Sequence, residues 1–442
     1  GVFSKVHIPQ NLIILIVLFM SFFFAYRKRY SPLLFLISVA TINAPLFKVG
    51  YHAIPFQYFS FFPLIFAVFA RRKVTVPKSM FKMPIPVYLI LVTFILIVSL
   101  MSTVLTNART SLAEPFLFGT FRGMILRLVW LILVTILLTR LSRKEILSLI
   151  SKIITFLAVA NFTACIVQIF IGLPELFYLL YHSASLTPLE TVLAMGRFPR
   201  AYGLFGSPVN LGALVLTVSA LALILRKRGT YLLSLVIAIF SLSKTAILGL
   251  PIVTILWFSL KTLGFGETRK QFSTKRVLGI VFVSFAGVIV LLLLPNILRD
   301  RNMPVDYYFK YLRHPIQALE SRYDPALGSG LSETIEVIKQ YPLLGTGYTV
   351  IKEEFIGDST YLVLLKTTGI IGLVTYILFM GFIMLFFFQR RSMFILLPLI
   401  SLMSGVASST WVSFEQMFFL QASLVITIKP DATPRKLDQG LR

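Results

Sequence analysis

Two arginines precede a turn and an apolar segment in the middle of the chain. Arg197 and Arg200 are followed by two glycines and a proline within residues 203–208, and Asn210 then opens an apolar run. Glycine and proline in this arrangement indicate a turn, and asparagine often caps a helix N-terminus. Arginines beside a helix N-terminus can bind a phosphate, and arginines that only meet lipid headgroups are the alternative.

Lys244 is a further cation in an unexpected place. It stands between two hydrophobic runs, in the sequence Ser241-Leu242-Ser243-Lys244-Thr245-Ala246. A charge at membrane depth costs about 2.5–3.5 kcal/mol on insertion scales, so an ionisable residue there is a functional candidate by default. A lysine that snorkels to the membrane interface is the alternative.

Three other arginines are candidates for the same chemistry. Arg122 and Arg127 begin an apolar segment, and their spacing of five places them on neighbouring but not identical helix faces. They can pair with Glu114 or with a lipid phosphate, and a structural role is at least as well supported as a substrate role. Arg322 either forms a salt bridge within its own polar segment or points inward as a phosphate ligand.

The best candidate for a base is a carboxylate at the start of an apolar run. Asp358 stands just before the run Tyr361–Phe388, so we expect it at the membrane surface. A carboxylate there can act as a general base, and a solvated helix N-cap is the alternative.

The four histidines show no metal-ligand spacing, and the single cysteine, Cys165, lies in an apolar run. We therefore expect no metal site and a buried, unreactive cysteine.

These residues are set in a very apolar chain. Of the 442 residues, 57% are hydrophobic and 13% are charged, whereas soluble domains have about 45–50% and about 25%. This composition excludes a disordered chain and an ordinary cytosolic enzyme, and it indicates a polytopic membrane protein.

Thirteen apolar segments have the composition of membrane spans, although the pairs that meet near Lys48 and Lys244 are the least certain to be separate. The sequence thus predicts an all-α integral membrane protein with 12–13 transmembrane helices and one long extracytoplasmic loop. The predicted spans cover residues 11–26, 31–47, 53–70, 85–103, 122–139, 146–172, 210–225, 230–243, 246–262, 277–295, 359–388, 393–409 and 413–428.

Basic residues follow every second span. The net charge is +25, and 25 of the 42 lysines and arginines fall on these alternate connections. This is the pattern of the positive-inside rule, so the connections are predicted to be cytoplasmic and nucleic-acid binding is not needed to explain the charge.

The alternation predicts one membrane domain over residues 1–442 with two extracytoplasmic segments. Its parts are N-terminal spans at 11–172, an outer segment at 173–209, central spans at 210–295, a long outer loop at 296–358, C-terminal spans at 359–428 and a cytoplasmic tail at 429–442. The long loop holds nine of the 17 acidic residues, and we expect a short helix within Ser332–Gln340 that stops before Pro342.

Two segments together resemble the O-antigen polymerase and O-antigen ligase family. That family commonly shows arginine, Gly-x-Phe and Pro-x-Asn-x-x-Gly entering a span, and residues Arg200–Gly212 follow this pattern. It also shows Pro-Leu-Leu-Gly-x-Gly, a polar pair before Tyr-Leu, and Gly-x-x-Gly-Leu. The segments Pro342–Gly347, Asp358–Leu362 and Gly369–Leu373 follow in that order.

The resemblance implies a membrane glycosyltransferase of the multi-pass lipid-sugar (GT-C-like) class in the bacterial cytoplasmic membrane. Its site would lie on the extracytoplasmic face and transfer a glycan from undecaprenyl pyrophosphate to the sugar hydroxyl of another lipid-linked repeat. Transfer in the family needs no metal or cofactor, because cationic side chains hold the pyrophosphate. A chain-length regulator and a flippase are expected partners of such a polymerase, and membrane lipid surrounds it.

The resemblance also assigns roles by position. Arg200 matches the first arginine of the family, Lys244 takes the place of an arginine, and Arg322 corresponds to the arginine of the long loop. Asp358 replaces the histidine that is the suspected base of the ligases, which favours a polymerase. The predicted pyrophosphate- and substrate-binding residues are Arg197, Arg200, Lys244, Arg322, Arg122, Arg127, Asn210 and Tyr361, with Asp358 as the catalytic base.

Three alternatives stay open. A ligase would transfer the glycan to a lipid core or another acceptor with the same donor site. A transporter or flippase would suit the number of spans, although transporters often show internal repeats and broken helices, and no clear repeat is visible. A peptidoglycan polymerase shares the architecture, but its motifs are missing from this sequence.

Overall fold

A computed structural model describes residues 2–43, 46–49, 52–69, 77–110, 118–171, 201–205, 208–241, 243–266, 331–349, 359–405 and 413–429. The predicted span 277–295 lies outside these residues. So do most of the two predicted outer segments and all but the first residue of the C-terminal tail.

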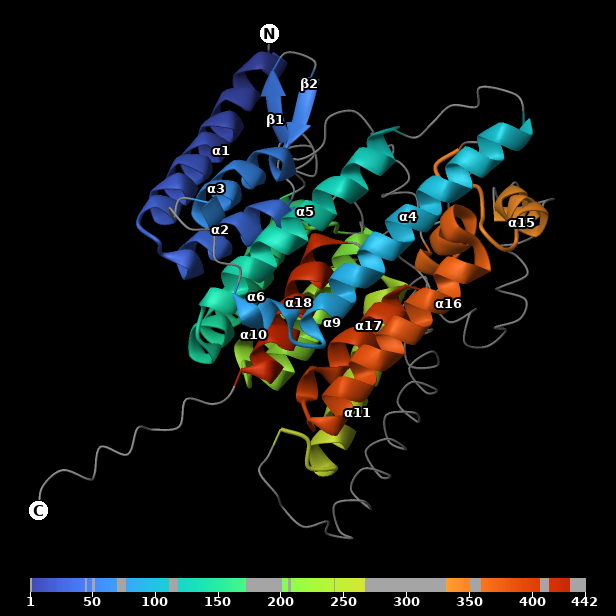
Figure 1. Cartoon of the computed structure of the whole chain (residues 1–442). Coiled ribbons are helices and arrows are strands. Elements are labelled where there is room, and N and C mark those ends of the chain that lie inside the picture. Colours follow the sequence, from blue (N-terminus) through green and yellow to red (C-terminus); the bar gives the residue numbers. More distant parts are fainter. Residues whose placement is uncertain are drawn as a thin grey trace, which may run out of the picture.

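The described part of the chain is built almost wholly of helices (Figure 1). In chain order they are α1 (Val2–Tyr26), α2 (Tyr30–Asn43), α3 (Phe56–Phe69), α4 (Ile85–Thr110), α5 (Phe118–Arg140), α6 (Arg143–Ile166), α9 (Pro208–Ile224), α10 (Arg228–Ser241), α11 (Lys244–Thr262), α15 (Leu331–Gln340), α16 (Thr360–Gln389), α17 (Leu396–Ser404) and α18 (Phe414–Ile428). Short 3-10 turns lie at Lys78–Phe81 and Met393–Ile395, and a π-helical turn at Val167–Ile171 extends α6.

The helices identify an all-helical membrane protein. Among the described residues, five helices are long and apolar enough to cross a membrane, and seven shorter apolar helices accompany them. Each falls on a predicted span, and α15 confirms the short helix expected before Pro342.

One prediction near the N-terminus is wrong in detail. We expected helix over 31–47 and 53–70, but α2 ends at Asn43 and a two-stranded antiparallel hairpin follows, with β1 (Leu46–Val49) paired to β2 (His52–Pro55). Pro45 explains the early end of α2, because proline disfavours helix at the residue before it and cannot donate a helical hydrogen bond.

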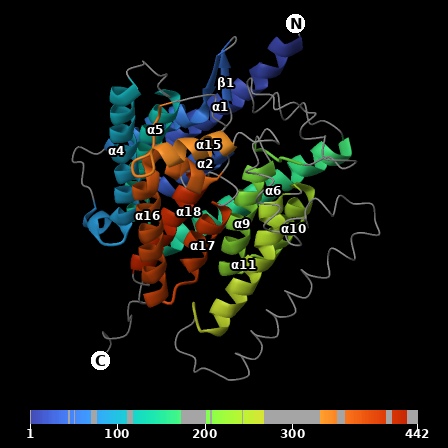
Figure 2. The same cartoon turned by 90° about the vertical axis from the view of Figure 1, so that its right-hand side faces the viewer.

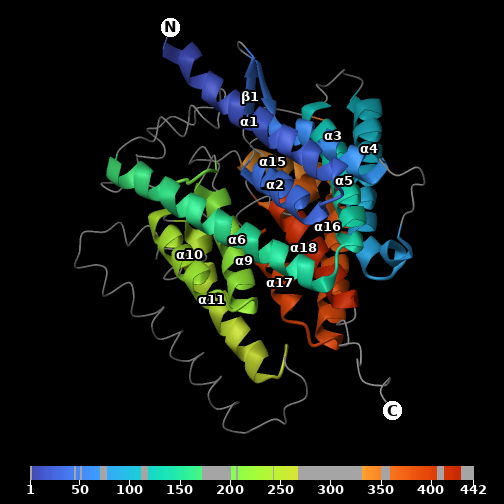
Figure 3. The same ribbon diagram turned by 90° about the vertical axis from the view of Figure 1, so that its left-hand side faces the viewer.

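The core is arranged around a fully enclosed helix. Thirteen residues of α18 are buried, and it packs against α2, α4, α5, α6 and α17. A second group is formed by α9, α10 and α11, and α17 joins the two groups by packing on α9, α11, α16 and α18. Figure 3 shows α6 running across both groups, which agrees with its packing on α2 and α18 and on α9 and α10.

The helices have two distinct ends. In Figure 2 the hairpin and α15 lie toward one end, and the C-terminal ends of α11 and α16 lie toward the other. α9, α11 and α16 each begin with a segment of the predicted site. A basic turn follows α9 and α16, and α11 has Lys261 in its last turn. Because α16 has 30 residues, the two ends are roughly 40 Å apart.

Three basic turns share one backbone geometry. Lys28, Arg226 and Arg391 follow the C-terminal ends of α1, α9 and α16 with φ values of 56°, 58° and 47°. In each turn the next amide reaches back five residues, as in the bond from Lys227 N to Ala222 O at 2.7 Å. Glycine is the usual residue at this position, so a basic residue is kept here despite a backbone cost of about 1–2 kcal/mol.

Candidate active site

Two buried amides, Asn161 of α6 and Gln168 of the π-helical turn that extends it, hold the turn that follows Arg200. The Gln168 Oε1 atom accepts hydrogen bonds from Tyr202 N at 3.1 Å and Gly203 N at 3.0 Å, and its Nε2 donates to Gly203 O at 2.8 Å. Asn161 Oδ1 accepts from Leu204 N at 2.9 Å. Both amides reach the same turn, Tyr202–Leu204, from consecutive parts of one helical segment. The turn is therefore fixed by this segment.

The same turn is tied to the end of α10. Ala201 N donates to Phe240 O at 2.9 Å, and Ala201 is fully buried. Arg197 and Arg200 lie outside the described residues. The residue after Arg200 is nevertheless anchored to α10.

The start of α9 corrects one prediction. The helix begins at Pro208, so the exposed Asn210 lies within its first turn and is not its N-cap. Proline suits the first turn of a helix because its fixed φ is helical and its missing N–H has no intrahelical partner there.

A glycine brings the starts of α9 and α11 together. A Cβ atom added at Gly212 would lie 2.1 Å from Ser243 Oγ, so only glycine permits this approach. Ser243 is buried and directly precedes Lys244, the first residue of α11. The Lys244 side chain lies outside the description, but its backbone begins α11 beside the start of α9, close to the turn after Arg200.

α16 is broken at Gly369, and residues 341–349 complete its backbone hydrogen bonds. Gly369 has φ 62° and ψ −161°, so the chain leaves the helical conformation there. Ile370 N donates to Pro342 O at 2.8 Å, and Thr346 N donates to Lys366 O at 2.6 Å. A Cβ at Gly369 would lie 2.3 Å from Leu343 O, so the motif glycine is required where the two segments touch. Buried backbone groups at a helix break need such partners.

Residues 341–349 are also fixed to α4. Tyr348 N donates to Thr103 Oγ1 at 2.8 Å, and Ser102 Oγ donates to Leu344 O. Thr349 Oγ1 bonds Asn107 Oδ1 at 3.1 Å. The Pro-Leu-Leu-Gly-x-Gly motif is thus a structural clamp between α4 and α16.

The start of α16 is fastened to the end of α17. Thr360 N donates to Gly405 O at 2.8 Å, and Ser359 Oγ donates to the same carbonyl at 3.1 Å. The Tyr361 hydroxyl donates to Leu402 O at 2.6 Å, so its proton is engaged with α17. Asp358 lies outside the described residues, immediately before this anchored segment.

The arginines of α5 point to different neighbours. The exposed Arg122 lies over the Tyr58 ring at 5.1 Å, and Arg127 lies over the Phe414 ring at 5.8 Å. Arg127 also interacts electrostatically with Glu415, a buried residue of α18. These contacts support a structural role for Arg127, which the sequence left open against a substrate role.

Sequence reasoning missed a buried lysine. Lys366 is 1% exposed and lies one turn before the break at Gly369, within the span Thr360–Gln389. The signal was available, because a lysine inside an apolar run is the same kind of feature as Lys244. The amides Asn161 and Gln168 were missed as well, since a polar residue within a span does not show which backbone it bonds.

The structure brings the start segments of α9, α11 and α16 to one end of the molecule, with α17 packed on all three helices. Arg322 lies outside the described residues. Among the described residues, no group of three or more His, Cys, Asp or Glu side chains could hold a metal ion.

No protein-family model and no curated protein matches the chain. Function is therefore inferred from the residues, their arrangement and the resemblance of the motifs.

Proposed function

We propose that this protein is a membrane glycosyltransferase that polymerises lipid-linked oligosaccharide repeat units of a surface polysaccharide. One observation carries the proposal: three motif segments, at the starts Pro208, Lys244 and Thr360 of α9, α11 and α16, lie at the same end of the molecule, around α17. That end is opposite the basic turns, so the positive-inside rule assigns it to the extracytoplasmic face.

The proposed reaction needs a cationic site and a base. The acceptor hydroxyl oxygen attacks the anomeric carbon, the bond from that carbon to the pyrophosphate oxygen breaks, and the hydroxyl proton passes to the Asp358 carboxylate. Undecaprenyl pyrophosphate leaves as an anion, and Arg200, Lys244 and Arg322 stabilise its charge. By resemblance to the family, this transfer uses no metal.

The pair Asp358-Ser359 supports a polymerase over a ligase. Ligases of the family typically carry His-Asn at this pair, and polymerases vary more. Lysine at 244 keeps a point charge but gives up the bidentate phosphate binding of arginine. Both enzymes would use the same donor site, so the acceptor decides between them.

A membrane transporter is the second candidate, and the break in α16 favours it. Discontinuous helices often form the binding sites of transporters. In this protein, however, residues 341–349 fill the break and satisfy its backbone groups. A filled break serves packing, so the glycosyltransferase remains the preferred proposal.

The test is deletion and rescue in the native host, with the surface glycan separated by size on a gel. A polymerase deletion leaves single repeat units on the final carrier, whereas a ligase deletion accumulates long chains on undecaprenyl pyrophosphate. An unchanged glycan would overturn both and favour a transporter.

The rescuing copies are the wild type, Arg200→Ala, Lys244→Ala and Asp358→Asn, with Lys28→Ala as the control at the opposite end. We expect the wild type and the control to restore long chains and the three site variants to fail at normal membrane levels. Full rescue by all three site variants would refute the assigned site.

A further inference from the structure

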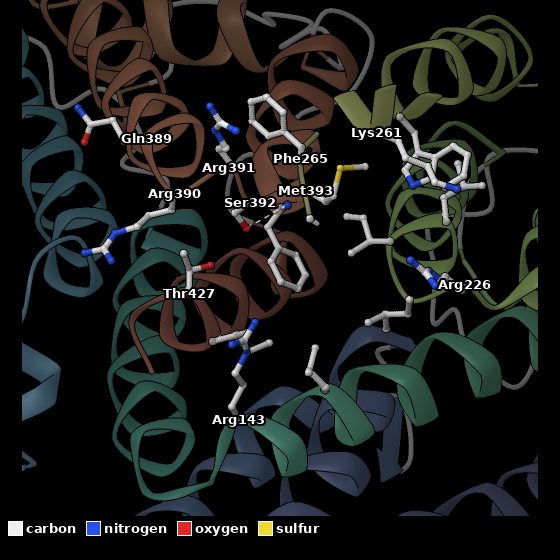
Figure 4. A pocket seen from close by; sticks show the side chains of 18 residues that line it. Arg143, Arg226, Lys261, Phe265, Gln389, Arg390, Arg391, Ser392, Met393 and Thr427 are labelled. Atoms are coloured by element: carbon white, nitrogen blue, oxygen red, sulfur yellow. Dashed lines mark hydrogen bonds between the residues drawn. The ribbon is translucent and has the colours of Figure 1, made fainter. Parts of the chain in front are cut away.

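A cavity of about 760 Å³ opens at the end of the molecule opposite the candidate active site (Figure 4). It lies among the C-terminal ends of α9, α11, α16 and α18 and the start of α6. Gly266 N donates to Arg391 O at 2.9 Å, which joins the end of α11 to the turn after α16. That bond builds one wall of the cavity.

Five basic residues line this cavity, and none of its described lining residues is acidic. They come from α6, from the turn after α9, from α11 and from the end of α16 and its turn; they are Arg143, Arg226, Lys261, Arg390 and Arg391. In Figure 4, Arg143, Arg226 and Arg391 approach the open space from different sides. Because like charges repel most where water is partly excluded, such a cluster favours an anion between its members.

Apart from Gln389, Ser392, Thr427 and Gly266, the remaining residues of the lining are apolar or aromatic. Leu147, Leu223, Trp257, Phe265 and Phe394 line the cavity between the basic groups. The ammonium of Lys261 lies 5.0 Å from the centre of the Trp257 ring, so this cation is held at the edge of the apolar wall. Free phosphate would leave that wall exposed to water, whereas a lipid would cover it.

We propose that this basic pocket, formed by the eighteen residues drawn in Figure 4, binds an anionic phospholipid. The guanidinium groups bind the lipid phosphate, and the acyl chains lie along the apolar wall. Basic pockets between membrane helices are a known way of selecting anionic lipids. The lipid would hold the α9–α11 group against α16 and α18. This proposal does not rest on the proposed glycosyltransferase function.

The positive-inside rule alone would also place basic residues in these turns. Lys28 provides a control for that explanation. Lys28 has the same left-handed backbone and the same place after a helix as Arg226 and Arg391, but it does not line the pocket. Glutamine at any of these positions removes one charge and keeps a polar, unbranched side chain. The variant Lys28→Gln therefore measures the effect of a basic turn without the pocket.

The test is lipid retention by the purified full-length protein, measured by native mass spectrometry after exchange into detergent with phosphatidylglycerol or phosphatidylcholine. We expect the wild type to retain phosphatidylglycerol preferentially. Arg226→Gln combined with Arg391→Gln should weaken this retention about tenfold, and Lys28→Gln should leave it unchanged. Equal retention of the two lipids by the wild type would overturn the proposal. An equal loss in Lys28→Gln would do so too.

A second measurement covers the case in which the double variant does not fold. Brominated phosphatidylglycerol should quench tryptophan fluorescence of the wild type more than brominated phosphatidylcholine does, and Trp257→Phe should remove that difference. Inorganic phosphate at millimolar concentration should not displace the lipid. Displacement by phosphate would show that the pocket binds phosphate alone and would refute the lipid.

Discussion

Two buried amide side chains, Asn161 and Gln168, hold the backbone that follows Arg200. Gln168 alone satisfies two N–H groups and one carbonyl, and all three hydrogen bonds are buried. A buried polar group that loses its partner costs about 1–3 kcal/mol. At the scale of single residues, the amide of Gln168 is therefore the main determinant of this turn.

We predict that Gln168→Leu lowers the thermal stability of the purified protein by several degrees and reduces glycan polymerisation. Leucine fills a similar volume but leaves the amides of Tyr202 and Gly203 without partners, which destabilises the turn by roughly 2–5 kcal/mol. Differential scanning fluorimetry and the glycan gel measure the two effects. Gln340→Leu, at an exposed position of α15, is the matched control. If the two variants have the same melting temperature, Gln168 does not hold the turn.

A second residue prediction concerns the buried Lys366. A lysine enclosed in a membrane span is usually retained for function, and an apolar residue of similar size is often neutral or stabilising there. Lys366→Met should therefore melt at the wild-type temperature or above it, with glycan polymerisation clearly reduced. Lys339→Met, on an exposed position of α15, should change neither quantity. A less stable but fully active Lys366→Met would contradict a functional role.

At the scale of elements, the break in α16 and the segment 341–349 form one unit. Each supplies hydrogen-bond partners to the other, and Gly369 lies where a side chain would collide with Leu343. Gly381 lies in the same helix, and a Cβ there would meet nothing within 4 Å. Alanine is therefore expected to have opposite effects at Gly369 and Gly381 of this helix.

Gly369→Ala should greatly reduce the amount of folded protein in the membrane, because both φ and the contact with Leu343 forbid a side chain. Gly381→Ala should be neutral or stabilise α16 by up to about 1 kcal/mol, since alanine favours a helix over glycine. The amount of each variant in the membrane and its melting temperature test whether the break requires glycine at position 369. Wild-type behaviour of Gly369→Ala would show that the break is not required.

Most elements could be predicted because apolar runs encode helices in a membrane directly. The hairpin at Leu46–Pro55 could not, since it interrupts a run that is apolar on both sides, and only Pro45 signals the interruption. The break of α16 at Gly369 could not be predicted from hydropathy either. Hydropathy averages over about 20 residues, so it does not register a single glycine whose partner, Leu343, lies 26 residues earlier.

The candidate site could be proposed from the sequence as segments along the chain, but the contacts of those segments could not. Motif segments placed the starts of α9, α11 and α16 together, and the structure has these helices packed around α17. The partners of those segments come from α4, α6 and α17, which no local pattern in the sequence connects to them. The roles of Arg200, Lys244 and Asp358 stay predictions.

At the scale of the whole molecule, the basic turns and the basic pocket lie at one end, and the candidate active site lies at the other. The basic pocket and the turns after α1, α9 and α16 hold lysines and arginines, and the candidate active site lies at the other end of α9, α11 and α16. The single cysteine, Cys165, is buried, so its replacement by alanine gives a simple background for labelling.

In that background, Asn210→Cys lies in the first turn of α9 and Gly229→Cys in the first turn of α10, after the basic turn, and both positions are exposed. We predict that a membrane-impermeant maleimide labels Asn210→Cys in intact cells and labels Gly229→Cys only after the membrane is opened. Gel-shift labelling measures both. The reverse pattern would invert the topology and place the candidate active site in the cytoplasm.

The most direct test of the central claim is reconstitution of the purified protein in liposomes with its host's undecaprenyl-pyrophosphate-linked repeat unit. Glycan length and released undecaprenyl pyrophosphate are measured together. The proposed mechanism predicts a ladder of glycan lengths with one undecaprenyl pyrophosphate released for each new linkage, lost in Lys244→Ala and Asp358→Asn and kept in Lys28→Ala. Folded wild-type protein that releases no undecaprenyl pyrophosphate and extends no glycan would contradict it.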